Sequence, residues 1–273
     1  MKGNIKISIV LPSRGRPKRL YKLLESIVST TNELAGIEVV VILDRDDEQN
    51  YLRRTFGELN CKFIIGEPRR SMGELNQDCV LKSNGETIFF SNDDVVFRTN
   101  DWDTLLLREI SAWPNSVYLM YPNDMFKGRK LCTFPIMSRK LLKEYPEILP
   151  RKYLGAFMDL HIMDIFKAYQ FGARIKYLNT LVCEHQHYRT NAEFFDATYK
   201  DRDRFGDDEC FIALASERAE IVSRLNGEDF DRPVSPKACS ILHLLRSSAS
   251  FYWRIKLFAY MLSRRVYRLL FAV

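Results

Sequence analysis

Short apolar runs alternate with longer segments of helical periodicity along the first 190 residues of the chain. Runs rich in aliphatic, β-branched and aromatic residues predict seven strands, over residues 5–11, 39–43, 61–65, 87–91, 117–121, 130–137 and 174–183. The segments between them predict one helix that begins at Pro17, two helices over 72–83 and 102–113, one from a Ser138 cap through Tyr145, and one that ends at Gly172. A shorter helix is predicted over about 48–56. This alternation indicates an α/β domain with a parallel sheet and helical crossovers.

Two segments modify this picture. Pro135 cannot donate a backbone hydrogen bond, so the 130–137 strand is expected at an edge of the sheet. After residue 190 the chain becomes polar and charged, and a helix is predicted from Gly206 through Leu225, ended by Asn226-Gly227. That helix either covers one side of a binding site or packs as a surface helix on the domain.

Polar side chains follow the ends of the predicted strands. Residues 12–14 (Pro-Ser-Arg) follow the first strand, Asp44 the second, Arg69-Arg70 the third and residues 92–94 (Asn-Asp-Asp) the fourth. Ligands of parallel sheets bind beyond the carboxyl ends of the strands. Arginines and carboxylates gathered at that edge suit a nucleotide diphosphate together with a metal ion.

The acidic residues 92–94 carry the strongest chemical signal. Asp93 and Asp94 stand directly after a buried strand, where unpaired carboxylates cost free energy. A hard divalent cation that brings phosphates with it would compensate. The alternative is a solvated turn or a helix cap.

Composition narrows the class of protein. A hydrophobic content of 46% and a charged content of 28% are ordinary for a globular protein of 273 residues. The six cysteines are scattered without a CxxC pair, which favours reduced thiols in a cytoplasmic protein. The N-terminus does not read as a signal peptide, and no long uncharged apolar run predicts a transmembrane helix.

Several nucleotide-binding motifs are absent from the sequence. No GxGxxG follows the first strand, which argues against a dinucleotide-binding fingerprint, and no GxxxxGK[ST] indicates a P-loop. A G-x-G-T-R-like loop is also absent, which disfavours a sugar nucleotidyltransferase.

The central stretch resembles the family 2 glycosyltransferases, which have the A-type glycosyltransferase fold. The matching pieces, in order, are residues 72–76 (MGELN), the turn 84–86 (NGE), the apolar strand 88–90 (IFF) and the acidic loop 92–94 (NDD). The likeness covers roughly residues 5 to 190, and the order and spacing of the pieces carry it. It implies a single Rossmann-like domain with a mixed, mostly parallel sheet flanked by helices.

The resemblance also implies a site and a reaction. Pro12, Arg14 and Asp44 would border the base and ribose of a nucleotide-sugar donor, a UDP-sugar being favoured, and Asn76 and Asn92 would join the donor site. Arg70, with Arg14, would bind the phosphates. Asp94, with Asp93 or Asn92 assisting, would hold Mn²⁺ or Mg²⁺. Transfer to a hydroxyl of a glycan or glycolipid acceptor would invert the anomeric centre.

The segment 154–188 supplies the remaining catalytic candidates. In the family an acidic pair opens a helix here, and a strand then delivers a histidine, which places Asp159 as the base and His185 at the metal. Met158 replaces the usual glutamate of that pair, so Asp164 remains an alternative base. His187 lies two residues after His185 and would share its strand face. A non-catalytic nucleotide-sugar-binding or membrane scaffold subunit remains the alternative function.

The C-terminal segment differs from the rest of the chain. From Lys237 onward there are seven basic residues and no acidic ones, whereas the remainder holds 34 basic and 35 acidic residues. This basic, aromatic-rich tail predicts an amphipathic helix or helix pair at an anionic membrane surface, with the protein at the inner face of a cell membrane. The alternatives are a helical hairpin packed on the domain or on a second copy in a homo-oligomer. Binding of nucleic acid is not expected.

The predicted domains follow from these observations. Residues 1–232 would form the catalytic domain, with a nucleotide-sugar-binding half at 1–97 and an acceptor-side half at 98–232. Residues 233–273 would form the helical tail that associates with membrane or with another subunit.

Overall fold

A computed structural model describes residues 5–51, 55–68, 70–113, 115–196 and 207–227, together with residues 255, 258 and 259. The expectations for Arg69 and for nearly all of the tail from residue 233 lie outside the described residues. No helix among the described residues is long and apolar enough to cross a membrane.

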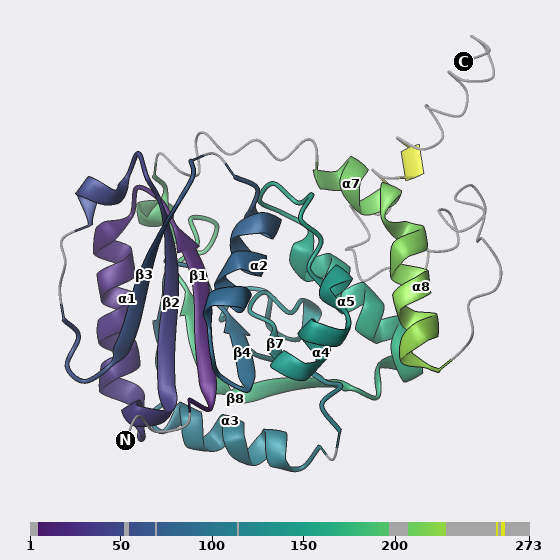
Figure 1. The fold of residues 1–273 in the computed structure, drawn as a ribbon, viewed down its shortest axis with the longest axis horizontal. Helices are drawn as coiled ribbons and strands as arrows, with labels where there is room; N and C mark the ends of the chain where they lie inside the picture. The colour runs from purple at the N-terminus through teal and green to yellow at the C-terminus, as the bar shows by residue number, and fades with distance from the viewer. Residues whose placement is uncertain are drawn as a thin grey trace, which may run out of the picture.

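The described part of the chain is built on one mixed sheet of eight strands (Figure 1). Its order is β3-β2-β1-β4-β7-β6-β8-β5. The strands are β1 (Ile7–Ser13), β2 (Ile37–Asp44), β3 (Asn60–Gly66), β4 (Thr87–Phe90), β5 (Val95–Phe97), β6 (Leu119–Asn123), β7 (Ile136–Ser138) and β8 (Ile175–His185). The pairs among β3, β2, β1 and β4 are parallel, as is β6 with β8, whereas β7 and β5 pair antiparallel. The α/β class and the mixed, mostly parallel sheet are therefore as predicted.

Helices cover both faces of this sheet (Figure 1). They are α1 (Pro17–Thr30), α2 (Met72–Lys82), α3 (Trp102–Ser111), α4 (Arg139–Glu144), α5 (Met158–Ala168), α7 (Asp207–Ala213) and α8 (Ala215–Leu225). Helices α1 and α3 pack on one face, while α2, α4, α5 and α8 pack on the other. Successive side chains of β1 alternate between the two cores, because a strand presents them to opposite faces. Ile9 lies with α1 and Val10 with α2.

Local sequence explains where several helices begin. Pro17 stands in the first turn of α1, where its missing N–H costs nothing. Ser71 and Glu74 form a capping box at the start of α2, and Ser138 Oγ accepts a hydrogen bond from Leu141 N at the start of α4. The predicted starts of these three helices are confirmed.

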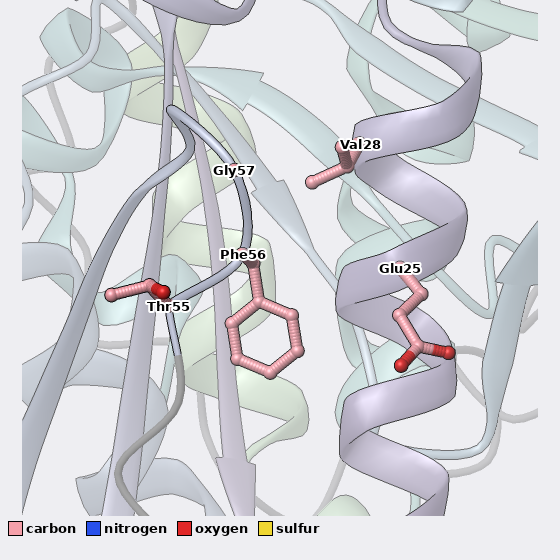
Figure 2. A pocket seen from close by; sticks show the side chains of 5 residues that line it. All are labelled: Glu25, Val28, Thr55, Phe56 and Gly57. Carbon is pink, nitrogen blue, oxygen red and sulfur yellow. The ribbon is translucent and has the colours of Figure 1, made fainter.

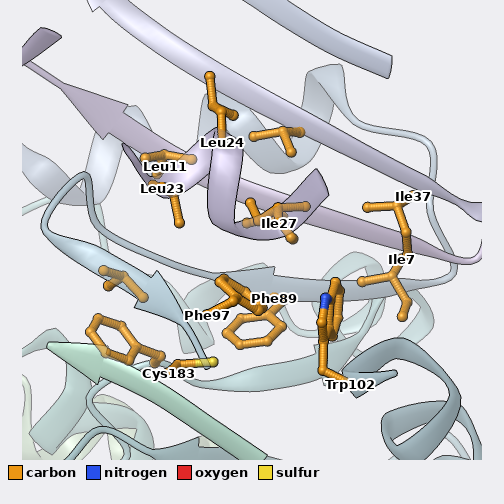
Figure 3. Close-up of a cluster of buried hydrophobic side chains, with 14 of the residues drawn as sticks. Ile7, Leu11, Leu23, Leu24, Ile27, Ile37, Phe89, Phe97, Trp102 and Cys183 are labelled. Carbon is orange, nitrogen blue, oxygen red and sulfur yellow. The ribbon is translucent and has the colours of Figure 1, made fainter. Parts of the chain in front are cut away.

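The sheet curls so that its last strand returns toward its middle. Only residues 91–94 link β4 to β5, although three strands separate them in the sheet order. Their aromatic rings still meet, because the centroids of Phe89 and Phe97 are 5.5 Å apart and both rings contact Trp102 (Figure 3). In a flat sheet, strands so placed would lie about 19 Å apart. The curl brings the acidic loop between the two halves of the domain.

Two predicted elements were wrong. The strand predicted over 130–137 is only Ile136–Ser138, and it lies between β4 and β6 instead of at an edge. Pro135 precedes this strand, and its carbonyl accepts a hydrogen bond from Phe90 N at 3.0 Å, so its missing N–H does not interrupt the pairing. Lys130 instead ends a 3₁₀ turn, Gly128–Lys130, and Thr133 Oγ1 donates to Asp124 Oδ2 at 2.8 Å. The buried carboxylate of Asp124 also accepts hydrogen bonds from Phe126, Lys127 and Gly128 N at 2.7–3.1 Å.

The short helix predicted over about 48–56 is not formed by the described residues of that range, from which 52–54 are excluded. Glu48–Asn50 forms a 3₁₀ turn, after which Tyr51 adopts an extended conformation. Tyr51 is buried, and its hydroxyl lies 2.9 Å from Ser13 Oγ. A tertiary contact of this side chain therefore replaces the helix that local periodicity favoured.

The helix predicted from Gly206 to Leu225 occurs as α7 and α8, with a break at Leu214. The helix expected to end at Gly172 ends in a 3₁₀ turn at that glycine, whose φ is 81°.

Candidate active site

The candidate site lies where β1, β2 and β4 end. These strands run parallel, so their carboxyl ends meet at one edge and bring together Ser13, Asp44 and the acidic loop. Ser13 Oγ donates a hydrogen bond to Asp93 Oδ2 at 2.8 Å. The contact joins residues 80 positions apart in the chain.

The two aspartates of the acidic loop are both buried. Asp93 is 6% and Asp94 is 4% exposed. Burial, with the charge of Asp94 next to it, raises the pKa of Asp93 to about 6 against the opposing effect of Arg16. A buried pair of like charges requires a compensating cation, as the sequence indicated.

Arg16 supplies positive charge directly to this pair. Its Nη1 lies 3.1 Å from Asp93 Oδ1 and 3.3 Å from Asp94 Oδ2, while Nη2 donates to Asp196 Oδ1 at 2.8 Å. Burial lowers the pKa of Arg16, but the hydrogen bond to Asp196 and the charges of Asp93 and Asp94 outweigh it, so the net shift is upward. Arg19 adds a second guanidinium, 3.1 Å from Asp196 Oδ2 and 3.9 Å from Asp94 Oδ2.

His185 reaches the acidic loop from the other half of the domain. It pairs with Val95 in the β5–β8 ladder, and its Nε2 lies 3.4 Å from Asp94 Oδ1. His187 does not share its strand face as predicted, because β8 ends at His185. The ring of His187 is instead stacked on Phe126 and Tyr188.

The predicted metal residues fit a divalent cation in part. Asp94 and His185 present an oxygen and a nitrogen that Mn²⁺ accepts as ligands. His185 Nδ1 is buried and has no hydrogen-bond partner in the described part of the chain. No acceptor there holds the ring proton on either nitrogen through Nδ1, so Nε2 can be the unprotonated nitrogen that a metal ion needs. Asp93 lies beside them, with its oxygens engaged by Ser13 and Arg16. Among the described residues no three His, Cys, Asp or Glu side chains converge as a complete metal site.

The outer rim of the site is formed by Arg14 and the residues after β2. Arg14 is half exposed and bridges Asp44 at 2.5 Å and Asp46 at 2.5 Å. Pro12 is the second-last residue of β1, pairs with Ile42 of β2 and is partly exposed. The structure thus places the three residues expected at the base and ribose together.

The other predicted donor residues are dispersed. Arg70 pairs with Asp78 of α2 at 2.7 Å, and this hydrogen bond raises its pKa. Asn76 is buried within α2, where its Nδ2 donates to Met72 O at 2.9 Å. Asn92 is partly exposed in the acidic loop beside Asp93. Arg70 and Asn92 are therefore accessible to a ligand, whereas Asn76 is engaged by its own helix.

The start of α5 lies close to the same edge. Its leading loop packs on the N-terminus of α2, where Gly73 N donates to Tyr153 O at 3.0 Å. Asp159 stands in the first turn of α5 and is partly exposed. Its carbonyl accepts a hydrogen bond from the thiol of Cys132. The loop of Cys132 also contains Phe126 and Phe134, whose rings contact the ring of His185. One loop therefore contacts both the candidate base and the candidate metal ligand.

Asp164 has a different environment. It is 2% exposed, and Arg218 Nε, which is itself buried, donates to Asp164 Oδ2 at 2.9 Å. This buried ion pair joins α8 to α5, and it leaves Asp164 far less exposed than Asp159.

A carboxylate from α7 fixes the loop that leads into α5. Asp207 is buried and accepts three backbone hydrogen bonds, from Leu154 N at 2.7 Å, Gly155 N at 2.9 Å and Ala156 N at 2.6 Å. The predicted helix after residue 206 is therefore joined to the loop that positions Asp159.

A shallow pocket lies elsewhere, between the last turns of α1 and the loop before β3 (Figure 2). Phe56 and Thr55 from the loop and Glu25 and Val28 from α1 line it. It includes none of the residues predicted for the site.

Sequence reasoning missed three residues of the site, namely Arg16, Tyr51 and Asp196, and it named Ser13 only as part of the polar segment after the first strand. Arg16 had a recognisable signal, because it is a cation between a strand end and the proline that starts a helix. Asp196 had none, since it meets Arg16 across 180 residues.

Comparison with known proteins rests on structure alone. No family model matches the chain, and no curated protein matches it. A structure of S. aureus TarS 1-349 in complex with UDP-GlcNAc is 19% identical, with 88% of this chain and 80% of that chain covered and a TM-score of 0.51. The same protein in complex with UDP is 17% identical, with 97% and 92% covered and a TM-score of 0.51.

A third solved structure is also similar. The mannosyltransferase PcManGT from Pyrobaculum calidifontis, in complex with GDP-Man and Mn²⁺, is 12% identical, with 97% of this chain and 87% of that chain covered and a TM-score of 0.50. At these identities the likeness concerns the fold. The described domain therefore has the A-type glycosyltransferase fold, with its mixed sheet between two helical layers.

Proposed function

We propose that this protein is a glycosyltransferase that moves a sugar from a nucleotide-sugar donor to a hydroxyl of a glycan or glycolipid acceptor. A UDP-sugar is the favoured donor. One observation carries the proposal: the buried Asp93–Asp94 pair meets Arg16 and His185 at the carboxyl edge of the sheet. Structures with the same fold contain UDP-GlcNAc, UDP, or GDP-Man with Mn²⁺, which supports a nucleotide-sugar ligand at this edge.

The reaction requires that negative charge on a leaving diphosphate be stabilised. A divalent cation, Mn²⁺ or Mg²⁺, held by Asp94 and His185 with Asp93 beside them, would supply positive charge there. Arg14 and Arg70, both partly exposed, would add charge-assisted hydrogen bonds to the phosphates. Pro12, Asp44 and Asn92 would border the nucleoside and sugar, and Asn76 would support α2 from within.

Asp159 would act as the base. Its carboxylate stands at the first turn of α5, partly exposed, and would accept the proton of the acceptor hydroxyl as that oxygen attacks the anomeric carbon. Attack opposite the leaving diphosphate inverts the configuration, so we propose an inverting enzyme. The loop of residues 124–135 would form the wall between this base and His185.

The proposal extends to the setting of the reaction. We place the protein in the cytoplasm at the inner face of a membrane, attached through residues 237–273, with residues 1–97 binding the donor and residues 98–232 the acceptor. A glycan or glycolipid of a cell-surface polysaccharide would meet the site there. The basic and apolar composition of the tail supports this placement.

A thermal-shift screen tests the donor site. We expect one of the UDP-, GDP- or CDP-sugars to raise Tm in the presence of Mn²⁺, because a ligand that binds the folded state stabilises it by mass action. Asp94→Asn should abolish the Mn²⁺-dependent shift, whereas Asp101→Asn, at an exposed position before α3, should retain it. A shift followed by no transfer to any acceptor would point to a non-catalytic binding subunit. No shift with any donor would refute the proposed function.

A further inference from the structure

The guanidinium of Arg16 lies in the middle of three carboxylates that come from distant parts of the chain. It contacts Asp93 and Asp94 through Nη1 and Asp196 through Nη2, at 2.8–3.3 Å. The Arg16 side chain is 9% exposed. Pro17 starts α1 directly after it, and Arg16 N donates to Tyr51 OH at 3.3 Å, so the backbone that carries this side chain is anchored.

This arrangement creates competition for Asp94. A divalent cation bound to Asp94 would share that carboxylate with Arg16, which holds Oδ2, while His185 faces Oδ1. Two positive centres on one buried carboxylate repel each other strongly, because solvent screens them little. The free protein therefore already provides the charge that a metal would bring.

The local charge supports the same conclusion. Among the residues that the structure describes, the three carboxylates face the two guanidiniums of Arg16 and Arg19, a balance of one net negative charge. A divalent cation alone would reverse that sign in a buried site, which is costly. A diphosphate arriving with the cation would bring negative charge of its own, and its oxygens would offer the planar guanidinium a bidentate partner.

We infer that Arg16 excludes divalent cations from the acidic pair in the donor-free protein and is transferred to the donor diphosphate when the nucleotide binds, so that metal and nucleotide bind together. This inference rests on the proposed function for its donor, but its first half concerns only the free protein. It makes Arg16 a residue of the donor site that regulates access to Asp94.

Direct measurement of Mn²⁺ binding tests the inference. The electron paramagnetic resonance signal of free Mn²⁺, titrated with protein, reports binding without any need for turnover. For the wild-type protein we expect Mn²⁺ to bind at least about tenfold more tightly with UDP present than without it. Equal Mn²⁺ affinity with and without bound UDP would overturn the inference.

Variants at Arg16 test the cause. Arg16→Gln removes the charge and should bind Mn²⁺ without nucleotide at least about tenfold more tightly than the wild type. Arg16→Lys keeps a cation and should exclude Mn²⁺ as the wild type does. Arg45→Gln removes an equal charge from an exposed pair with Glu67 and should leave Mn²⁺ affinity unchanged. If Arg16→Gln binds Mn²⁺ no more tightly than Arg45→Gln, the inference is wrong.

The two proposals fail in different ways. If no nucleotide binds under any condition, the proposed function fails, and the comparison of Arg16→Gln with the wild type in nucleotide-free buffer still decides whether Arg16 excludes metal. If Arg16→Gln does not fold, the wild-type titration with and without UDP decides it.

Discussion

Two aspartates five positions apart on α5 show how the role of a residue depends on its surroundings. Asp159 stands at the partly exposed start of the helix, whereas Asp164 is buried and bonded to Arg218. Arg218 also donates to Phe211 O at 2.8 Å, and its guanidinium lies 3.9 Å from the Phe211 ring centroid. Asp164 therefore belongs to the packing of α5, α7 and α8, whereas Asp159 stays partly exposed, as the proposed base would have to be.

Replacement of Asp159 and Asp164 by asparagine should separate catalysis from stability. Asp159→Asn should lower kcat by about 10²–10⁴-fold with little change in Tm or donor affinity, because only proton acceptance is lost. Asp164→Asn should cost about 3–5 kcal/mol of folding free energy, because it leaves the charge of Arg218 buried without its partner. Steady-state kinetics and thermal unfolding of both variants check this. Full activity of Asp159→Asn would exclude it as the base.

At the scale of elements, close backbone contacts position the site. Helix α2 begins against the loop of residues 150–154 with no room for a side chain at Gly73, where an added Cβ would lie 2.1 Å from Pro150 O. The turn before β4 is held by Glu38 of β2, whose side chain is fully buried. Glu38 accepts hydrogen bonds from Ser8 Oγ at 2.6 Å, from Lys62 Nζ at 2.6 Å and from Asn84 N in that turn. The glycine of the family-like helix start and the turn after α2 thus have specific packing roles.

Gly73→Ala should disturb the junction of α2 with the loop that leads into α5. We expect a loss of about 1–3 kcal/mol from overpacking against backbone that cannot yield, seen as a lower Tm. Gly36→Ala is the matched control, because its Cβ would meet only the flexible side chains of Lys6 and Glu33 at 3.7–4.0 Å. Equal stability of the two variants would contradict this account of Gly73.

Glu38 should make folding stability depend on pH. Burial raises its pKa, but the hydrogen bonds from Lys62, Ser8 and Asn84 N outweigh it, so the pKa lies below the ordinary value of 4.5. The folded state then binds this proton less tightly than the unfolded state, and the stability from Glu38 is present above about pH 4.5 and is lost as the pH falls further.

Glu38→Gln tests that dependence. We expect the variant to be less stable than the wild type by about 2 kcal/mol at pH 7, with the difference shrinking as the pH is lowered below about 4.5. Denaturant unfolding at a series of pH values measures it, and Glu67→Gln, at an exposed position, serves as control. A difference that stays constant down to pH 3 would show that the charge of Glu38 contributes nothing.

At the scale of the whole molecule, the site lies where the two halves of the sheet meet. The parallel half, β3-β2-β1-β4, carries Ser13, Asp44 and the acidic pair, and the second half supplies His185 from β8. The short link between β4 and β5 requires the sheet to curl, and this curl sets Asp94 opposite His185. The proposed donor and acceptor halves therefore meet at the acidic loop.

Removal of the tail tests the proposed division of the chain. A protein that ends at residue 236 should transfer sugar to a water-soluble acceptor at the rate of the full chain but should no longer sediment with vesicles that contain anionic lipid. The full chain on purely zwitterionic vesicles is the control, because the seven basic residues of the tail should then have little to bind. Unaltered vesicle binding after truncation would refute membrane attachment through the tail.

The sequence by itself determined the order of strands and helices, because apolar periodicity, capping residues and turn residues act over a few positions. It therefore located β1, β2, β3, β4 and β8, the starts of α1, α2 and α4, and the polar loops at the strand ends. It also singled out Asp93 and Asp94, since they follow a buried strand directly, whereas Asp159 and His185 were singled out by the resemblance to family 2 glycosyltransferases.

Only the tertiary structure decided which of these groups meet. Whether β7 is an edge strand, whether residues 48–56 form a helix, and whether Asp164 is buried depend on partners far away in the chain. Arg16 and Asp196 become part of the site for the same reason, because their contact spans 180 residues and no local pattern encodes it. Local periodicity determines what each segment becomes, whereas charges and packing between distant segments determine what the site contains.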